Sequence, residues 1–373
     1  MNAPHRNATA ESARRACIDA TVRADVRALA PYAVPAADGF IKLDAMENPF
    51  ALPDALAAAL GDTLSRVPIN RYPDAAAARV KDALRESLQL APGVSLLLGN
   101  GSDEIIQIVT SAVAGPAAGV VAPAPSFVMY GRCALTARAP FTEVALRNDF
   151  SLDVDSMLTA VERTQPALVW IAYPNNPTGN AFDAADIERI VRAAPGLVAI
   201  DEAYYPYADA SFITRALDYP NLVVVRTLSK IGLAGLRLGY AVAHPEWIAQ
   251  FDKLRPPYNV GSLAQAALPM LLQHADVFER QAAAIRAERA RMAAALAGLR
   301  GVRVFPTQAN FVLARVPDGF AWFAALRDAK ILVKNLDGWH PLLANCLRIT
   351  VGTSRENDAL IEVLAKCAEE RAS

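Results

Sequence analysis

Short apolar runs recur through the middle of the chain and alternate with stretches of helical periodicity. Because most runs are apolar throughout, they are typical of strands buried on both faces of a largely parallel sheet. Stretches such as 102–114 and 182–194 between them have the spacing of helices. This alternation predicts an α/β fold, in which ligands bind at the carboxyl ends of the strands. The runs are residues 94–99, 119–123, 141–146, 167–172, 197–201, 222–228 and 236–243.

The pattern changes after about residue 265. Residues 274–299, rich in alanine and arginine, are typical of one long helix, and shorter strands are expected in 302–306, 310–316, 330–335 and 346–352. We therefore expect a large domain with a mostly parallel seven-stranded sheet between helices. A smaller α+β domain would be built from the N- and C-terminal segments. The first residues are expected to form a frayed end that leads into a short helix. The predicted boundaries are 1–48 for an N-terminal arm and part of the small domain, 49–265 for the large domain and 266–373 for the small domain.

Composition excludes several classes of protein. The chain has 373 residues, of which 53% are hydrophobic, so it can bury a large core, and its net charge of -1 does not suggest a nucleic-acid partner. No apolar run approaches the roughly 20 residues of a membrane span, and the N-terminus lacks the apolar region of a secretory signal. The histidines lack metal-ligand spacing, so no metal is expected. The four cysteines have no paired spacing and fit free thiols in a reducing cytoplasm: Cys17, Cys133, Cys346 and Cys367.

One lysine stands where a predicted strand ends. Lys230 follows the run 222–228, a glycine-rich turn comes next, and Arg237 lies seven residues further on. A lone lysine in this position most often extends its ammonium group to solvent. The alternative is an amine with a lowered pKa that acts as a nucleophile or forms a Schiff base. The residues at other strand ends decide between the two.

Three further strand ends carry polar groups. Paired asparagines in 173–180 form a turn that could hold a ligand oxygen, and the ordinary alternative is a turn alone. Asp201 ends a buried strand, with Tyr204 three residues later; its partner could be a salt-bridge cation or a cationic ring nitrogen on a ligand. Residues 99–101, Gly-Asn-Gly, precede a helix whose free N–H groups could bind phosphate. Simple capping by the first helical residues is the alternative there.

The order of these four sites resembles that of the fold-type-I aminotransferases, which use pyridoxal 5'-phosphate. The resemblance extends from "DAMENPF" to "LRITVG". It implies that Lys230 holds the cofactor as a Schiff base and then moves the substrate proton. It also implies that Asp201 keeps the pyridine nitrogen protonated so that the ring accepts electrons. The implied catalytic residues are Lys230, Asp201 and Tyr204. The other implied cofactor-binding residues are Asn176, Phe127, Gly101, Ser102, Asp103, Ser229, Arg237 and Tyr72.

Several stretches are similar to the histidinol-phosphate aminotransferase branch of this family. They are "NRYPD", "GNGSDE", "GLAGLRLGY" and "LRITVGT". The resemblance implies transfer of an amino group from histidinol phosphate to 2-oxoglutarate in histidine biosynthesis. It also implies a homodimer in which Tyr72 reaches the neighbouring site. The implied substrate-binding residues are Arg348, Tyr32, Asn48, Tyr72 and Asn176.

The chain departs from this pattern at two places. Relatives often have eight residues from the lysine to the arginine, whereas here the turn is one residue shorter, which a tight turn at Gly232 would permit. Lys334 stands where relatives often have arginine, and Tyr130 is a second candidate for stacking on the cofactor ring.

The alternative functions are an aminotransferase of aromatic or other amino acids, a threonine-phosphate decarboxylase that uses pyridoxal phosphate, or a non-catalytic sensor with this fold. A sensor would carry a DNA-binding module, which the first 45 or so residues do not resemble.

Overall fold

The computed structural model describes residues 4–31 and 35–370, which fall into two compact units, residues 1–38 and 39–373. In the first unit, helix α1 (Pro4–Thr21) is followed by α2 (Ala24–Arg27). The expectation of a short helix here was wrong, since α1 has 18 residues. Its composition, with many alanines and arginines, has a high helix propensity.

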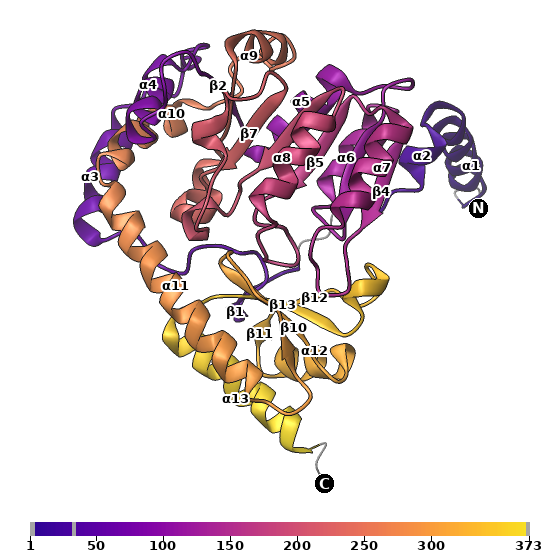
Figure 1. Ribbon diagram of the computed structural model, residues 1–373, viewed down its shortest axis with the longest axis vertical. Coiled ribbons are helices and arrows are strands. Elements are labelled where there is room, and N and C mark those ends of the chain that lie inside the picture. Colours follow the sequence, from indigo (N-terminus) through magenta and orange to yellow (C-terminus); the bar gives the residue numbers. More distant parts are fainter. Residues whose placement is uncertain (1–3, 32–34, 371–373) are drawn as a thin grey trace. The chain divides into compact units, whose positions relative to one another are not determined.

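The second unit contains a seven-stranded sheet (Figure 1). Its order is β2-β8-β7-β6-β5-β3-β4, and all neighbours are parallel except those of β8, which runs antiparallel to β2 and β7. Each of the seven apolar runs forms one strand, so the prediction of a mostly parallel seven-stranded sheet is confirmed. The strands are β2 (Ser95–Gly99), β3 (Val120–Ala124), β4 (Phe141–Ala145), β5 (Leu168–Ala172), β6 (Leu197–Asp201), β7 (Leu222–Thr227) and β8 (Gly239–Ala243).

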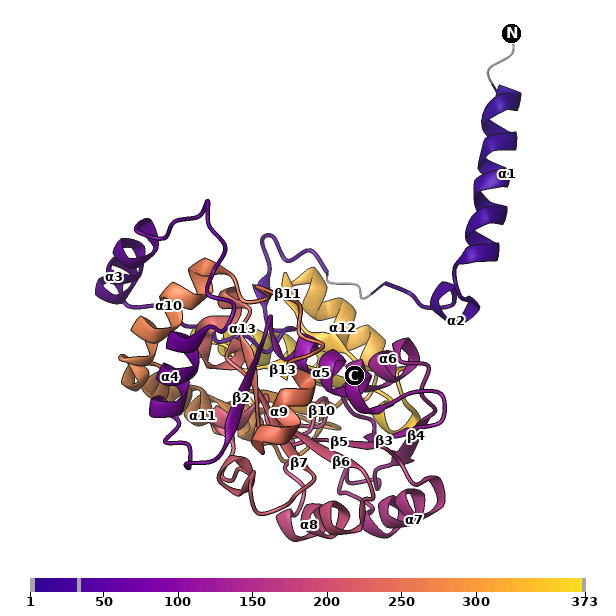
Figure 2. The ribbon, with the colours of Figure 1, turned by 90° about the horizontal axis from the view of Figure 1, so that it is seen from above.

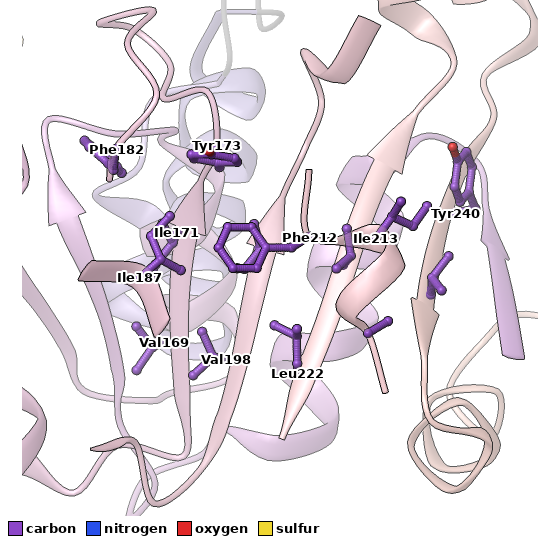
Figure 3. Packing of buried hydrophobic residues seen from close by; sticks show 14 of the residues in the cluster. Val169, Ile171, Tyr173, Phe182, Ile187, Val198, Phe212, Ile213, Leu222 and Tyr240 are labelled. Atoms are coloured by element: carbon purple, nitrogen blue, oxygen red, sulfur yellow. The ribbon is translucent and has the colours of Figure 1, made fainter. Parts of the chain in front are cut away.

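Helices cover both faces of this sheet, because alternate residues of each strand point to opposite sides. One face, with Val169, Ile171 and Val198, packs against α7 (Val154–Thr164), α8 (Ala184–Ala193) and α10 (Ser262–Leu272), and part of this core is shown in Figure 3. The other face, with Trp170 and Ala199, packs against α5 (Ser102–Val113), α6 (Met129–Thr136) and α9 (Pro245–Phe251). Asp201 lies two residues after Ala199 in β6, so its side chain is on the same face of the sheet as Ala199. Helix α10 also packs on α3 (Asp54–Ser65) and α4 (Ala78–Ser87), as both ribbon views show (Figure 1, Figure 2).

A second sheet, in the order β12-β13-β10-β9, is built from the C-terminal part of the chain. The long helix α11 (Ala275–Ala297) packs on α13 (Ser354–Glu370) and on strands β9 and β10 (Figure 1). Strand β1 (Ile41–Lys42) pairs with β11 (Ile331–Leu332), so an early segment joins this later part. The expected strand 330–335 is divided in two, because β11 and β12 pair with different neighbours. The remaining elements are β9 (Arg303–Val304), β10 (Phe311–Arg315), α12 (Gly319–Asp328), β12 (Lys334–Asn335) and β13 (Cys346–Thr350).

The predicted boundaries at residues 48 and 265 stay a prediction. Among the described helices, none has the length and apolar character needed to cross a membrane. Within the same residues, no cluster of His, Cys, Asp or Glu side chains has the arrangement of a metal site.

Candidate active site

The chain passes the carboxyl edge of the large sheet in one tight turn. After β7 ends at Thr227, a short π-helical turn spans Ser229–Leu233, and Arg237 leads back into β8. Gly232 has φ 117° and Arg237 has φ 50°, both in the left-handed region. These two conformations reverse the chain within few residues, and the expectation of a tight turn at Gly232 is met. Because β8 is antiparallel, Arg237 enters at the same sheet edge that Lys230 leaves.

Lys230 is largely enclosed at this edge. Its Nζ donates a hydrogen bond to the carbonyl oxygen of Ala45 at 3.1 Å and lies 5.9 Å from the ring centroid of Tyr204. Burial, and after it the positive charge of Arg348, lowers the pKa of the Lys230 amine to about 8. Near neutral pH roughly a tenth of this amine is therefore uncharged, far more than for an ordinary lysine, and a nucleophile or proton acceptor requires the uncharged form.

Asp201 lies at the end of β6 and is only 4% exposed. Its Oδ2 accepts a hydrogen bond from the hydroxyl of Tyr130 at 2.8 Å, and its Oδ1 accepts one from the backbone N–H of Ala203 at 3.1 Å. Burial raises the pKa of the Asp201 carboxyl to about 6, although both hydrogen bonds lower it. Among the described residues no cation forms an ion pair with Asp201, so a buried carboxylate faces this site without an opposite charge.

The Gly-Asn-Gly turn meets the incoming Arg237. Gly101 has φ 87°, and a side-chain carbon there would lie 2.7 Å from Nη2 of Arg237. The same arginine lies 3.9 Å from a carboxylate oxygen of Asp103. A side-chain carbon on Gly239 would lie 2.5 Å from the backbone nitrogen of Ser102, where helix α5 begins. The two glycines thus bring a guanidinium group to the N-terminus of a helix, where an anion is favoured by both the dipole and the free N–H groups.

An arginine from the second sheet reaches the edge of the first. Arg348 donates a hydrogen bond from Nη1 to the side-chain oxygen of Asn176 at 2.6 Å, and from Nη2 to the carbonyl oxygen of Asp44 at 3.0 Å. Lys334 is its cross-strand neighbour, and its Nζ lies 4.8 Å from the ring centroid of Trp339. Burial, and then the charge of Arg348, lowers the pKa of Lys334. Two cations therefore stand side by side next to the loop of paired asparagines.

The segment 41–50 connects the two sheets at the site. The backbone N–H of Met46 donates to the Thr350 hydroxyl at 2.9 Å, and the amide of Asn310 donates to the carbonyl oxygen of Met46 at 2.9 Å. Asn48 donates to the carbonyl oxygen of Ile231 and to the side-chain oxygen of Gln281, at 3.0 and 2.9 Å. The amide of Asn48 is thus bound to the turn that carries Lys230.

The other expected residues are distributed as follows. Tyr204 is buried and meets Phe311 edge-on at 5.2 Å, and Phe127 meets Tyr130 edge-on at 5.8 Å. The hydroxyl of Ser229 accepts a hydrogen bond from Thr227 at the end of β7, 2.9 Å away. Tyr72 is 81% exposed and stacks on Tyr258, with ring centroids 4.5 Å apart. Tyr32 lies outside the described residues.

Sequence reasoning missed three contacts of the site. Tyr130 was considered only as a stacking ring, whereas its hydroxyl binds Asp201. The carbonyl of Ala45 and the close approach of Gly239 to α5 involve backbone atoms, which no residue type reveals. The one available signal was the spacing of Tyr130, three residues after Phe127, which places both on one face of a helical turn.

The matching family model and the two relatives described next are all named as aminotransferases. The family model described as aminotransferase class I and II matches residues 38–364. Histidinol-phosphate aminotransferase 1 of Burkholderia lata is 53% identical over 92% of this chain and 96% of its own length. Histidinol-phosphate aminotransferase of Chromobacterium violaceum is 52% identical over 92% of this chain and 97% of its own length.

The fold has a close counterpart among solved structures. The crystal structure of histidinol-phosphate aminotransferase from Sinorhizobium meliloti, in complex with pyridoxal-5'-phosphate, superposes with a TM-score of 0.84. The match covers 94% of this chain and 98% of that chain at 24% sequence identity, so it supports the fold.

Proposed function

Since the chain belongs to the class I and II aminotransferases, we propose that it transfers the amino group of histidinol phosphate to 2-oxoglutarate. The products are imidazole-acetol phosphate and glutamate, and the cofactor is pyridoxal 5'-phosphate. The observation that carries this choice of donor is 53% identity to a histidinol-phosphate aminotransferase over almost the whole of both chains. The enzyme is a transferase of amino groups and acts in histidine biosynthesis.

The residues of the site fit pyridoxal phosphate. Its pyridine ring, when bound through a Schiff base, withdraws the electrons that are left when the substrate Cα loses a proton. Asp201 is a buried carboxylate that no cation of the described residues pairs, and a protonated ring nitrogen would supply that charge. Arg237 and the N–H groups at Ser102 and Asp103 suit the phosphate. Asn176 and Tyr204 would hold the ring oxygen, and Phe127 would lie against the ring face.

Lys230 has two roles in this proposal. Its Nζ would hold the cofactor, and the same Nζ, once free, would take the proton from the substrate Cα and deliver it to the cofactor carbon C4′. An amine with a pKa of about 8 suits both steps, because it is readily deprotonated near neutral pH. Tyr207 donates a hydrogen bond to the backbone carbonyl oxygen of Lys230, which supports the position of this residue.

Two unlike anions must use one subsite in turn. Arg348 would bind the phosphate of the donor and then a carboxylate of 2-oxoglutarate, because its planar fork matches either group. Lys334 stands beside it and would add a positive charge, but its ammonium group cannot form the two parallel hydrogen bonds that a guanidinium group forms. Tyr32 and Asn48 are the further proposed substrate contacts. For Asn48 this contact would add to its hydrogen bonds with the Lys230 turn.

We further propose a homodimer in which Tyr72 reaches the partner's cofactor phosphate. Its support is the 81% exposure of Tyr72, with Ile69 at 83% and Tyr258 at 42% in the same region. Exposed aromatic residues in one region are typical of an interface. A fully active enzyme that sediments as a monomer would contradict this. A cytoplasmic location, where thiols such as Cys133 and Cys346 stay reduced, belongs to the same proposal.

A donor screen tests the proposed reaction. The purified holoenzyme is incubated with 2-oxoglutarate and one donor at a time: histidinol phosphate, phenylalanine or threonine phosphate. We expect glutamate to form with histidinol phosphate at a kcat/KM at least about 100-fold above that with phenylalanine, because the doubly charged phosphate can pair with both Arg348 and Lys334, whereas phenylalanine offers a single carboxylate charge. Turnover of phenylalanine alone would refute the assigned donor and leave the class intact. Release of carbon dioxide from threonine phosphate would instead favour a decarboxylase.

The close contact between Gly239 and the start of helix α5, at the proposed phosphate site, gives a second prediction. We expect Gly239→Ala to weaken the affinity for pyridoxal phosphate by at least about tenfold, because the new methyl group meets the backbone nitrogen of Ser102 at 2.5 Å and displaces the start of α5. Equilibrium titration of the apoenzyme with cofactor measures the change. Gly235→Ala, in the adjoining turn, is the matched control, since nothing lies within 4 Å of a side-chain carbon there. Equal affinities of the two variants would argue against a phosphate site at this position.

A further inference from the structure

Tyr130 is held in one orientation by the core. It is 1% exposed, and its ring lies flat against Trp170, with centroids 5.0 Å apart and an interplanar angle of 3°. Trp170 is itself fixed, because its indole N–H donates to the Thr110 hydroxyl on α5 at 3.2 Å. A ring packed in this way has little rotational freedom. Its hydroxyl therefore points to Asp201.

This hydroxyl opposes the effect of burial on Asp201. A carboxyl group deprived of water tends to retain its proton, and a hydrogen bond donated to the carboxylate favours the ionised form. The tyrosine remains a donor over the working range of pH, because burial and the neighbouring Asp201 raise its pKa well above the ordinary value. The carboxylate is held from two sides, by Tyr130 on Oδ2 and by the N–H of Ala203 on Oδ1.

We propose that Tyr130 is a positioning residue that acts through Asp201, keeping its carboxylate ionised and aimed at the ring nitrogen of the cofactor. The inference rests on the proposed cofactor and deepens that assignment. The hydroxyl of Tyr130 contacts neither substrate nor reacting atoms in this proposal; its whole effect passes through one hydrogen bond of 2.8 Å. The aromatic ring has a separate role, which is to fill the core between α6 and β5.

The two roles separate in the variant Tyr130→Phe, which keeps the ring and removes the hydroxyl. The apoenzyme is titrated with pyridoxal phosphate, and with an analogue in which a carbon replaces the ring nitrogen. We expect the variant to bind pyridoxal phosphate about tenfold more weakly, as for loss of one hydrogen bond to a charged group. Its affinity for the carbon analogue should be unchanged, because that ring has no charge for Asp201 to balance. Equal losses with both ligands would mean a purely structural role and would overturn the proposal, as would no loss with either.

Two further measurements make the test specific. Tyr219→Phe removes another buried hydroxyl, which accepts a hydrogen bond from Arg215 at 2.8 Å, and it should change neither affinity. In an Asp201→Asn background, Tyr130→Phe should have no further effect on the ratio of the two affinities. A tenfold effect that persists there would refute action through Asp201. Both measurements are made without substrate, so failure of the proposed donor would leave this result unaffected.

Discussion

Replacing Lys230 with alanine is expected to lower the turnover of histidinol phosphate by at least about 10⁴-fold. The variant loses the amine that holds the cofactor and the group that moves the substrate proton, and the second loss alone is worth about 10²–10⁴. No other amine is expected to substitute, because the pKa of about 8 depends on burial at this position and on the adjacent charge of Arg348. Glutamate formation under saturating cofactor measures the effect.

The matched control for this variant is Lys253→Ala. Lys253 is exposed and contacts the side chain of Gln250, so its removal should leave turnover within a factor of about two. Borohydride treatment followed by peptide mass measurement provides a second readout. It should add the mass of the cofactor to the peptide that contains Lys230, in the wild-type protein only. Full turnover by Lys230→Ala would refute the mechanism whichever donor the enzyme uses.

The variant Asp201→Asn is expected to be nearly inactive and yet, as an apoenzyme, more stable than the wild type. Activity should fall on the order of 10³-fold, because the neutral amide cannot balance a protonated ring nitrogen. Stability should rise because the wild-type protein buries a carboxylate with no cation among the described residues to pair it. Asparagine has nearly the same shape and can still accept the hydrogen bond from Tyr130.

The sign of this effect depends on pH. The pKa of Asp201 rises from 3.8 to about 6 on folding, so between these values the folded protein retains a proton that the unfolded chain has released. Wild-type stability therefore falls as the pH rises through this window, and it stays lower above it. The rise corresponds to a cost on the order of 3 kcal/mol at most. Denaturant unfolding of the two apoproteins should give similar free energies at about pH 4 and a clear advantage for Asp201→Asn at about pH 8.

The neighbouring acid provides a contrast. Glu202 is also buried, but it forms an ion pair with Arg226 at 2.9 Å and accepts a hydrogen bond from the Ser211 hydroxyl. Glu202→Gln should therefore destabilise the protein, by about 3 kcal/mol or more, because it leaves the buried Arg226 without the negative charge that it pairs with. If both substitutions shift stability in the same direction at about pH 8, the view of Asp201 as an unbalanced charge is wrong.

Local pattern was sufficient to predict the large sheet. Most of its strands are apolar along nearly their whole length, and a run of that kind between helices has few alternatives to a buried strand of such a sheet. The pattern was less informative in the second sheet, where residues 330–335 form two short strands. Which neighbour each half joins depends on β1 and β13, and β1 lies some 290 residues away along the chain. No local rule contains that information.

The site was predictable in its residue types and less so in its contacts. Lys230 and Asp201 stand at strand ends, and strand ends of one parallel sheet meet at one edge, so their proximity follows from the fold class. The hydrogen bond from Lys230 to Ala45 joins positions 185 residues apart and depends on the path of the segment 41–50. The orientation of Tyr130 depends on the flat contact with Trp170. Packing of this kind is set by shape, which residue types alone do not specify.

The segment 41–50 also constrains when the site can form during synthesis. It leaves the ribosome early, yet Met46 is held by Asn310 and by Thr350, which is synthesised some 300 residues later. The large sheet, complete at residue 243, can fold while these partners are still absent. The nascent chain thus contains Lys230 and Asp201 for many seconds before the segment is fixed beside them. Completion of the site is therefore a late step, which waits for the synthesis of Asn310 and Thr350.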